Sequence, residues 1–470
     1  MTLYQDLVGE FSGLIEQGVL KPGEKLPSVR ALCISRRLSQ STVLQAYHHL
    51  EDRGLIEARP RSGYLVGAWW KQLPREPAGA RAPRAATAVD VADLVFDVLE
   101  ATRQRRMVPL GSAFPSPLLF PLPRLAQLLG QVARRLDPWA TVTDLPPGSW
   151  ELRRQIARRY LLAGAQVKVE EIVITSGAME ALNLCLQAVT EPGDIVAVDS
   201  PTFYGALQAL QRRGLKALEI PSDPRDGVKL DQLERMLERH PVRACWFMNS
   251  FQNPLGGCMP EAQRQRLVTL LAARGIPLIE DDVYSELYFG REPPRPAKAY
   301  DRAGLVLHCG SFAKCLAPGY RVGWAAPGRY ADAVARLKFT ASISTNVPAQ
   351  EAIARYLGEG GFEHHLRRLR QALQAQQNRM LQAIGQHFPA GTRVSRPRGG
   401  YFLWLELPAT VDALELHRQA AERDISIAPG PMFSSRGQFG HCIRLNSGHP
   451  WSGEIEAAIR SLGRLAAAMA

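Results

Sequence analysis

The sequence predicts a chain of two parts, a small helical domain that ends in a hairpin and a larger α/β domain. In the first 66 residues, apolar side chains such as Leu3, Leu7 and Phe11 recur at helical spacing between breaks made by Pro and Gly. Farther on, short apolar runs at 172–174 and 276–279 lead into turns and helical patterns, as expected where strands alternate with helices. At 470 residues, two or three domains are expected.

Composition narrows the class of protein. Hydrophobic residues make up 46% of the chain and charged residues 22%, which is typical of a globular protein with an ample core. No apolar run reaches the roughly 18 residues of a membrane span, and Met1 leads into a polar amphipathic segment, so we expect a cytoplasmic protein without a membrane partner. The seven cysteines are scattered without a Cys-x-x-Cys pair, which indicates neither a disulfide framework nor a metal site.

Residues 1–66 predict a winged helix. After a first helix, the Pro- and Gly-rich stretch KPGEKLPS interrupts the pattern, and Ser28 can cap a second helix. Ser39 can cap a third, on which Val43, Tyr47 and Leu50 share one buried face. The alternation in LIEARPRSGYLV then predicts a hairpin. A helix, a helix-turn-helix and a hairpin together form a double-stranded-DNA-binding unit.

In that arrangement, one group of side chains faces phosphates or the minor groove and another faces the bases of the major groove. The first group is Arg30, Arg36, Arg37, Arg59 and Arg61, and the second, at the start of the third helix, is Ser39, Gln40, Ser41, Thr42 and Gln45. A net charge of +12 gives mild support, because many enzymes share it. An ordinary solvated helix face is the alternative for the polar positions.

This whole segment resembles the GntR family of bacterial transcription factors. The resemblance is carried by the sequences PGEKLPSVRAL, STVLQAYHHLEDRGLIE and RPRSGYLV. Many members have Arg where Gln40 or Leu44 stands here, and glutamine suits adenine rather than guanine. The base preference therefore stays open. Residues 67–106 mix Pro, Gly, Ala and Arg with little periodicity and predict a linker, although 91–99 is apolar enough to start a helix of the larger domain, 107–470.

The run GSFAKCLAPGYRVGW, from Gly310 to Trp324, predicts a covalent cofactor anchor. Apolar surroundings and nearby cations favour the unprotonated amine that Lys314 needs to condense with the aldehyde of pyridoxal phosphate. Ser311 and Arg321 are residue types that hold a phosphate. Two alternatives are a surface lysine and a serine-lysine hydrolase, whose motif has the same Ser-x-x-Lys spacing but whose Lys-Thr-Gly is missing.

This run closely resembles the lysine segment of fold-type I pyridoxal-phosphate enzymes, the aspartate aminotransferase superfamily. The resemblance implies an α/β domain with a small C-terminal α+β subdomain, and it assigns roles to motifs in family order. In ITSGAMEAL, the resemblance implies that Gly177, Ala178 and Met179 form the turn that binds the phosphate. The ring that stacks on the pyridine is implied to be Phe203, with Tyr204 as a rival, and the donor to the ring oxygen is implied to be Asn253. The partner of the pyridine nitrogen is implied to be Asp281, with Asp282 as a rival and Tyr284 as its companion, and the clamp for a substrate carboxylate is implied to be Arg444.

One family feature is missing. Where the family has a tyrosine that reaches the phosphate of the neighbouring subunit, five residues before Gly148, this chain has Thr143. Either one phosphate contact is weaker or another residue replaces it, with Trp150 and Tyr160 as candidates.

A GntR-type winged helix joined to an aminotransferase-like domain resembles the MocR subfamily. The resemblance implies a homodimeric transcriptional regulator that depends on pyridoxal phosphate and senses that cofactor, an amino acid or another amine. An aminotransferase is the alternative, since the implied set is complete for transamination, with Lys314 as the base. The winged helix discriminates between them, because a plain aminotransferase has no use for one.

Overall fold

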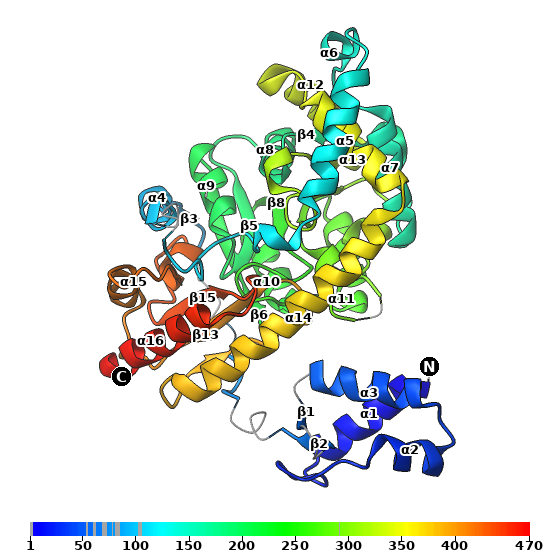
Figure 1. Cartoon of the computed structure of the whole chain (residues 1–470). Helices are drawn as coiled ribbons and strands as arrows, with labels where there is room; N and C mark the ends of the chain where they lie inside the picture. The colour runs from blue at the N-terminus through cyan, green and yellow to red at the C-terminus, as the bar shows by residue number, and fades with distance from the viewer. Residues whose placement is uncertain are drawn as a thin grey trace.

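The computed structural model in Figure 1 contains the two predicted parts. It describes residues 3–52, 55–59, 63–67, 73–77, 79, 85–101, 106–290 and 292–470. Within this described part of the chain, no helix is both long and apolar enough to cross a membrane. No cluster of three or more His, Cys, Asp or Glu side chains suited to a metal ion occurs there either.

The amino-terminal part is a winged helix, as predicted. Its elements are α1 (Leu3–Glu16), α2 (Val29–Arg36), α3 (Gln40–Asp52), β1 (Ile56–Arg59) and β2 (Gly63–Val66). Ser28 caps α2 by accepting the Ala31 N–H, and Ser39 accepts the Thr42 N–H at the start of α3. The strands pair antiparallel with Arg59 opposite Gly63. Ile15, Val43, Tyr47 and Leu50 are fully buried between the helices, so this domain has a core of its own.

The larger part is built on a mixed nine-stranded sheet. Its strands are β3 (Thr87–Ala88), β4 (Val173–Thr175), β5 (Ile195–Ser200), β6 (Lys216–Asp223), β7 (Gly227–Val228), β8 (Val242–Phe247), β9 (Leu278–Asp281), β10 (Val306–Ser311) and β11 (Gly323–Ala326). The order is β3-β6-β5-β8-β9-β10-β11-β4, with β7 beside β6. Strands β6, β5, β8, β9 and β10 run parallel, so their carboxyl ends meet at one edge.

Helices cover both faces of this sheet, which explains why its strands are apolar on both sides. The helices of the larger part are α4 (Ala92–Ala101), α5 (Leu122–Arg135), α6 (Ala140–Thr143), α7 (Trp150–Leu162), α8 (Ala178–Val189), α9 (Tyr204–Arg212), α10 (Leu230–Arg239), α11 (Glu261–Ala273), α12 (Ala331–Ser342), α13 (Val347–Gly358) and α14 (Gly361–His387), of which α6 lies away from the sheet at one end of the molecule. Residues of α4, α8 and α9 pack on one face, and residues of α10 and α11 pack on the other.

The smaller carboxy-terminal unit is α+β, as the family resemblance implied. An antiparallel sheet runs β12-β13-β15-β14 under two helices. The elements are β12 (Arg393–Val394), β13 (Phe402–Glu406), α15 (Ala413–Ala421), β14 (Ala428–Pro429), β15 (Cys442–Asn446) and α16 (Gly453–Met469). The long helix α14 contributes its carboxy-terminal half to the same core.

Parts of the segment expected to be a linker are attached to the larger domain. The Val394 N–H donates to Arg75 O (2.9 Å), Arg396 Nη2 donates to Pro74 O (2.9 Å), and Glu76 forms an ion pair with Arg225. Farther along, β3 pairs antiparallel with β6, and α4 packs on α9. These contacts come from described stretches within 67–106. The linker between the two domains is therefore shorter than the sequence suggested.

Candidate cofactor site and DNA-binding surface

The predicted site residues of the larger domain gather where the parallel strands end. Asp281 closes β9 and Ser311 closes β10, while β4 leads through Thr175 into the amino terminus of α8. The carboxyl end of a parallel sheet is the usual place for a ligand in such folds. A cavity of about 250 Å³ lies there, lined among others by Ala178, Asp281 and Lys314.

The turn before α8 forms an anion cradle with Arg321. Gly177 is the N-cap of α8 at φ 95°, and a Cβ on it would lie 2.5 Å from Arg321 Nη2, so only glycine lets the guanidinium approach. Arg321 donates to Ser176 O (3.3 Å) and is itself in the left-handed region at φ 52°. A strained arginine beside a helix amino terminus is a geometry suited to phosphate.

Lys314 extends into the cavity on the loop after β10. Its Nζ donates to Ala113 O (2.8 Å) and lies 3.6 Å from the centre of the Phe114 ring. Burial, together with the cations Arg444 and Arg321, lowers the pKa of Lys314 to about 7, although the Asp281 carboxylate opposes the shift. A large neutral fraction at physiological pH is what a nucleophilic amine requires.

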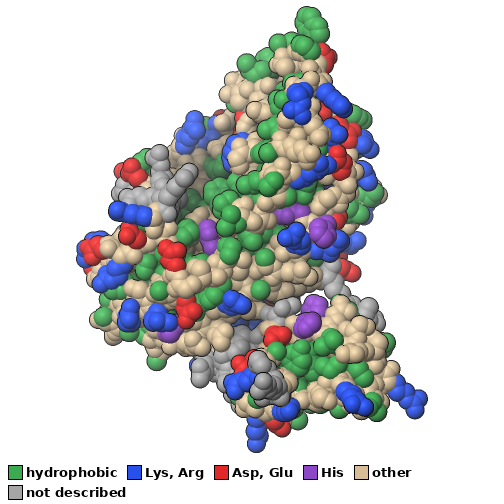
Figure 2. Space-filling model, viewed as in Figure 1, with side chains coloured by type: hydrophobic (Ala, Val, Ile, Leu, Met, Phe, Trp, Pro, Cys, Tyr) green, Lys and Arg blue, Asp and Glu red, His purple; other side chains and the backbone are tan. Residues whose placement is uncertain are grey.

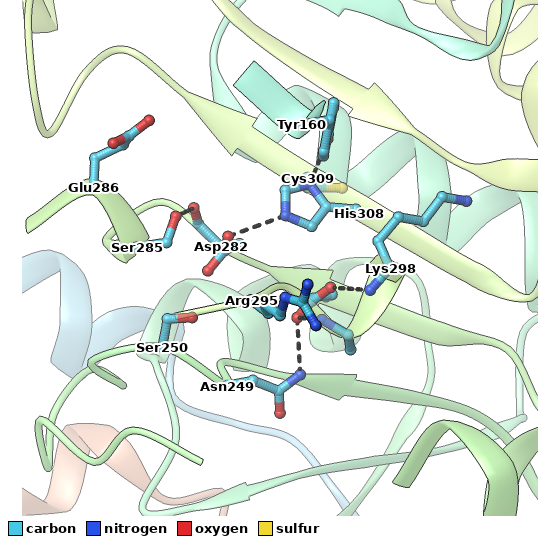
Figure 3. A network of polar contacts seen from close by, with 12 residues as sticks. Tyr160, Asn249, Ser250, Asp282, Ser285, Glu286, Arg295, Lys298, His308 and Cys309 are labelled. Atoms are coloured by element: carbon cyan, nitrogen blue, oxygen red, sulfur yellow. Dashed lines mark hydrogen bonds and ion pairs between the residues drawn. The ribbon is translucent and has the colours of Figure 1, made fainter. Parts of the chain in front are cut away.

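The structure separates Asp281 from its rival Asp282. Asp281 lines the cavity, whereas Asp282 lies on the opposite face of the sheet and accepts from His308 Nε2 (3.1 Å), as Figure 3 shows. Burial and the Asp282 carboxylate raise the pKa of Asp281 to about 7, while Lys314 lowers it. In the same network Tyr160 Oη bonds His308 Nδ1 (2.7 Å), and Trp324 Nε1 donates to Tyr160 (2.9 Å).

Two orphaned polar atoms test whether pyridoxal phosphate fits. Among the buried side-chain atoms of the described residues, Asp281 Oδ1 and Asn253 Nδ2 have no hydrogen-bond partner. Asn253 Oδ1 accepts from Arg444 Nη1 (3.0 Å), which leaves the amide nitrogen as the free donor. A carboxylate for a protonated pyridine and a donor for a phenolic oxygen are the groups that this cofactor needs, so the site fits it.

Arg444, on β15, is completely buried beside this cavity. Its Nη2 donates to Gly111 O (2.6 Å) and Ser112 O (3.3 Å), and its guanidinium lies 4.3 Å from the centre of the Phe402 ring. Its Nε has no partner among the described residues. A buried guanidinium held by neutral acceptors can take a carboxylate as its counter-ion.

The aromatic wall leaves the choice between Phe203 and Tyr204 open. Both line the cavity, with ring centroids 4.8 Å apart, and Phe203 is the residue directly before α9. Tyr204 is buried and also contacts Phe433, 5.9 Å between centroids. Tyr284 is buried edge-on to Tyr401 (5.6 Å), and burial raises the pKa of its phenol.

The structure bears on the two candidates proposed to replace the missing tyrosine. Thr143 is exposed at the end of α6, where its hydroxyl donates to Trp139 O (2.9 Å). Tyr160 is buried in the His308 network, which makes it unsuitable for a contact with another subunit. Trp150 is 55% exposed and stays available.

The predicted DNA-contacting side chains of the winged helix are largely exposed. Arg30, Ser39, Gln40, Ser41, Gln45 and Arg59 are exposed, as are Arg36 and Arg37, and Thr42 is half-buried. The hydroxyl of Ser39 bonds those of Ser41 (2.9 Å) and Thr42 (2.7 Å) at the start of α3. Arg36 pairs with Glu10 and Arg59 with Glu57, whereas Arg61 lies outside the described residues.

Some residues of the site were not anticipated from the sequence. Phe114, Tyr401 and Phe433 surround Lys314 and Arg444, and the Tyr401 hydroxyl donates to the same Ala113 O as Lys314 (3.0 Å). Tyr401 follows the glycine pair of PRGGYFLW, a signal that could have indicated a close approach of backbone. Phe114 and Phe433 have no comparable signal.

Comparisons with known proteins cover both parts of the chain. Residues 3–66 match the gntR family of bacterial regulatory proteins, and residues 133–462 match the aminotransferase class I and II family. The uncharacterized HTH-type transcriptional regulator YdcR of Escherichia coli is 46% identical over 465 residues, 99% of each chain. The 2-aminoadipate transaminase of Thermus thermophilus is 32% identical over 79% of this chain and 93% of its own.

Solved structures agree with the fold of the larger domain. The crystal structure of LysN, the alpha-aminoadipate aminotransferase from Thermus thermophilus complexed with N-(5'-phosphopyridoxyl)-L-leucine, is 31% identical and covers 80% of this chain and 94% of its own, with a TM-score of 0.74. A kynurenine aminotransferase from Pyrococcus horikoshii is 28% identical over 80% of this chain and 94% of its own, also with a TM-score of 0.74.

Proposed function

Because the chain belongs to the MocR-type HTH regulators, which join a gntR-type domain to an aminotransferase class I and II domain, we propose that it regulates transcription in response to pyridoxal phosphate and an amino acid. The winged helix binds promoter DNA in the cytoplasm, and the larger domain is the sensor. The observation that carries this proposal is the pairing of a complete winged helix with a lysine whose pKa is about 7 at the carboxyl end of the sheet.

Pyridoxal phosphate is the proposed cofactor. Lys314 binds its aldehyde covalently, Asp281 and Asn253 hold the ring, and the turn from Gly177 to Met179 with Arg321 and Ser311 holds the phosphate. When bound, the cofactor withdraws electrons from an amino acid joined to it. Lys314 then supplies an amine that is neutral near pH 7 and can give or take a proton at Nζ.

The effector is an amino acid or a close carboxylated analogue. Arg444 is the proposed clamp for its carboxylate, since its buried guanidinium donates to the neutral oxygens of Asn253, Gly111 and Ser112. Aromatic side chains around it exclude water, which strengthens a charge-assisted pair. A simple amine would leave the guanidinium without an anionic partner.

The proposed assembly is a homodimer. Figure 2 shows hydrophobic side chains at the upper end of the molecule, over α5 and α6. Exposed apolar residues there include Trp139 (73%) and Val142 (66%), and Leu145 and Trp150 follow within a few residues. An exposed apolar patch of this kind marks an interaction site, and paired DNA half-sites need paired winged helices.

Footprinting tests the proposed function. The promoter region of the protein's own gene is probed with and without pyridoxal phosphate, and with Lys314→Ala. Protection that changes with the cofactor supports the proposal, because only a ligand that discriminates between two conformations shifts their balance. No protection under any condition would favour an aminotransferase.

A second candidate function, aminotransferase activity, is favoured by Lys314 and Asp281, which line one cavity, together with the buried pair Arg444 and Asn253, which bond each other (3.0 Å). Incubation with an amino acid and a 2-oxo acid tests it, and amino-group exchange over many cycles would establish turnover. A serine-lysine hydrolase is disfavoured, because the Ser311 hydroxyl bonds Val322 O (3.2 Å) and the Ala313 N–H (3.1 Å), while Lys314 bonds Ala113 O. A fluorophosphonate probe should leave Ser311 unlabelled.

A further inference from the structure

The amino terminus of α8, which is proposed to hold the phosphate, also carries a carboxylate. Glu180 lies in the first turn of the helix, and its Oε2 accepts the Ser176 N–H (2.6 Å). The partial positive charge at this terminus favours one anion, so a carboxylate and a phosphate dianion in the same turn repel each other. Burial alone would raise the pKa of Glu180, but bonds from Lys338, Ser342 and Ser176 hold it below its usual value.

Lys338, on α12, compensates this charge. Its side chain is 1% exposed, and its Nζ donates to Glu180 Oε2 (2.8 Å) and to Ser342 Oγ (2.7 Å). The Ser342 hydroxyl in turn donates to Glu180 Oε1 (2.5 Å). Both carboxylate oxygens of Glu180 are therefore engaged, and the ammonium and the carboxylate are held in one closed arrangement.

The pair is joined to the anion cradle through the backbone of one residue. The Ser176 N–H bonds Glu180, and the Ser176 carbonyl accepts from Arg321. Loss of Lys338 would therefore do two things. It would leave Glu180 as an uncompensated anion beside the phosphate, and it would loosen the acceptor that orients the turn before Gly177.

We propose that Lys338 is a positioning residue for the phosphate group of the cofactor, which acts by neutralising and fixing Glu180 at the amino terminus of α8. The inference rests on the proposed function, because it requires pyridoxal phosphate in this cavity. A second buried lysine shows the contrast. Lys298 pairs with Glu171 (2.7 Å) and Asp301 (3.3 Å), but neither carboxylate belongs to the cradle.

The test compares pyridoxal phosphate with pyridoxal, which lacks the phosphate. Equilibrium affinity is measured by fluorescence for wild type, Lys338→Met, Glu180→Gln and the double variant. Lys338→Met should weaken pyridoxal phosphate binding about tenfold, which corresponds to about 1.4 kcal/mol, and should leave pyridoxal binding unchanged. The double variant should return to within about threefold of wild type, because it removes the uncompensated anion along with its partner.

Two further variants keep the test decisive. Glu180→Gln retains the cation near the phosphate and should bind pyridoxal phosphate at least as tightly as wild type, even if Lys338→Met fails to fold. Lys298→Met is the matched control. It removes another buried, ion-paired lysine and should lower the melting temperature without a specific loss of pyridoxal phosphate affinity.

Different outcomes would contradict the role of Lys338 and the proposed function. Equal loss of pyridoxal and pyridoxal phosphate in Lys338→Met, weaker pyridoxal phosphate binding in Glu180→Gln, or no recovery in the double variant would overturn the role of Lys338 while wild-type binding stands. A wild-type protein that binds neither compound would overturn the proposed function, and this inference with it.

Discussion

Lys314 and Arg444 both donate to the backbone of one short segment, Lys314 to Ala113 O (2.8 Å) and Arg444 to Gly111 O (2.6 Å). The two cations that the sequence assigned to the cofactor and to the ligand carboxylate are thus held by neighbouring carbonyl oxygens. A ligand that bonds Lys314 competes with Ala113 O for the amine, whereas Arg444 Nε, which has no partner among the described residues, can take a carboxylate while Nη2 stays on Gly111 O.

Lys314→Ala should abolish the covalent link to pyridoxal phosphate and preserve the fold, because the anion cradle and Asp281 do not depend on the amine. Borohydride reduction followed by peptide mass mapping should place the adduct on Lys314 in wild type. Lys298→Ala is a suitable comparison for the loss of a buried lysine. An adduct on another lysine at saturating cofactor would contradict the assignment.

Arg444→Ala should weaken amino-acid binding by about 1.5–3 kcal/mol, roughly 10- to 150-fold, the range for a charge-assisted pair. Arg444→Lys keeps the charge but loses the two-pronged geometry, and it should recover only part of the affinity. Titration of the cofactor absorbance with an amino acid and with the matching decarboxylated amine measures both. Equal response to the two ligands in wild type would show that Arg444 is no carboxylate clamp.

The covalent link should depend on pH with a midpoint near 7. Below that pH, Lys314, with its pKa lowered to about 7, is protonated and cannot condense. Asp281, with its pKa raised to about 7, is then neutral and cannot pair with the ring nitrogen, so both shifts predict loss of the link as pH falls and gain as it rises. The absorbance of the bound cofactor, measured across neutral pH, gives the fraction that is covalently linked.

Asp281→Asn should move the Lys314 titration to lower pH, since the Asp281 carboxylate is what raises the pKa of that lysine. Reductive trapping of the cofactor at a series of pH values follows the lysine separately from the ring. A midpoint that stays in place would mean that the two groups do not interact, and one that rises would contradict the sign of the interaction.

Replacing Gln40 or Gln45 should change which operator sequence is preferred, with little effect on nonspecific affinity, because both side chains are exposed at the start of α3. Arg30→Ala should weaken binding to all sequences and reduce the salt slope by about 1. Gln17→Ala, exposed on the same domain beyond α1, is the control. Selection from a randomised DNA pool at two salt concentrations distinguishes the effects.

Trp139→Ser with Val142→Ser should produce monomers, because both side chains belong to the exposed apolar patch over α5 and α6. Light scattering on the purified variant measures the mass. Leu414→Ser removes an exposed apolar side chain (41%) from the smaller unit and should leave the assembly intact. A dimer that survives the double substitution would place the interface elsewhere.

The sequence predicted both folds because each depends on local periodicity and on motifs with fixed spacing. It placed Asp281 ahead of its rival Asp282, but it did not give the side of the sheet that each carboxylate takes, because the pairing of β9 with β10 sets this. The burial of Lys338 could not be predicted, because ADAVARLKFTAS is an ordinary amphipathic pattern. Only the packing of α12 on α8 buries its amine. Strand β3 is two residues long and carries no periodicity.

The bonds at Pro74 and Arg75 shorten the linker that joins the winged helix to the larger domain. Leu73, which packs beside the core of the smaller unit, follows Val66, the last residue of β2, by only seven positions. Such a stretch reaches at most about 25 Å. In the proposed homodimer, two such stretches together could extend the gap between the half-sites by no more than about 50 Å, or about 15 base pairs at roughly 3.4 Å each. In the proposed regulator, the anchor would therefore limit the spacing between half-sites, and a ligand that moves the smaller unit would shift the range of spacings that can be bound.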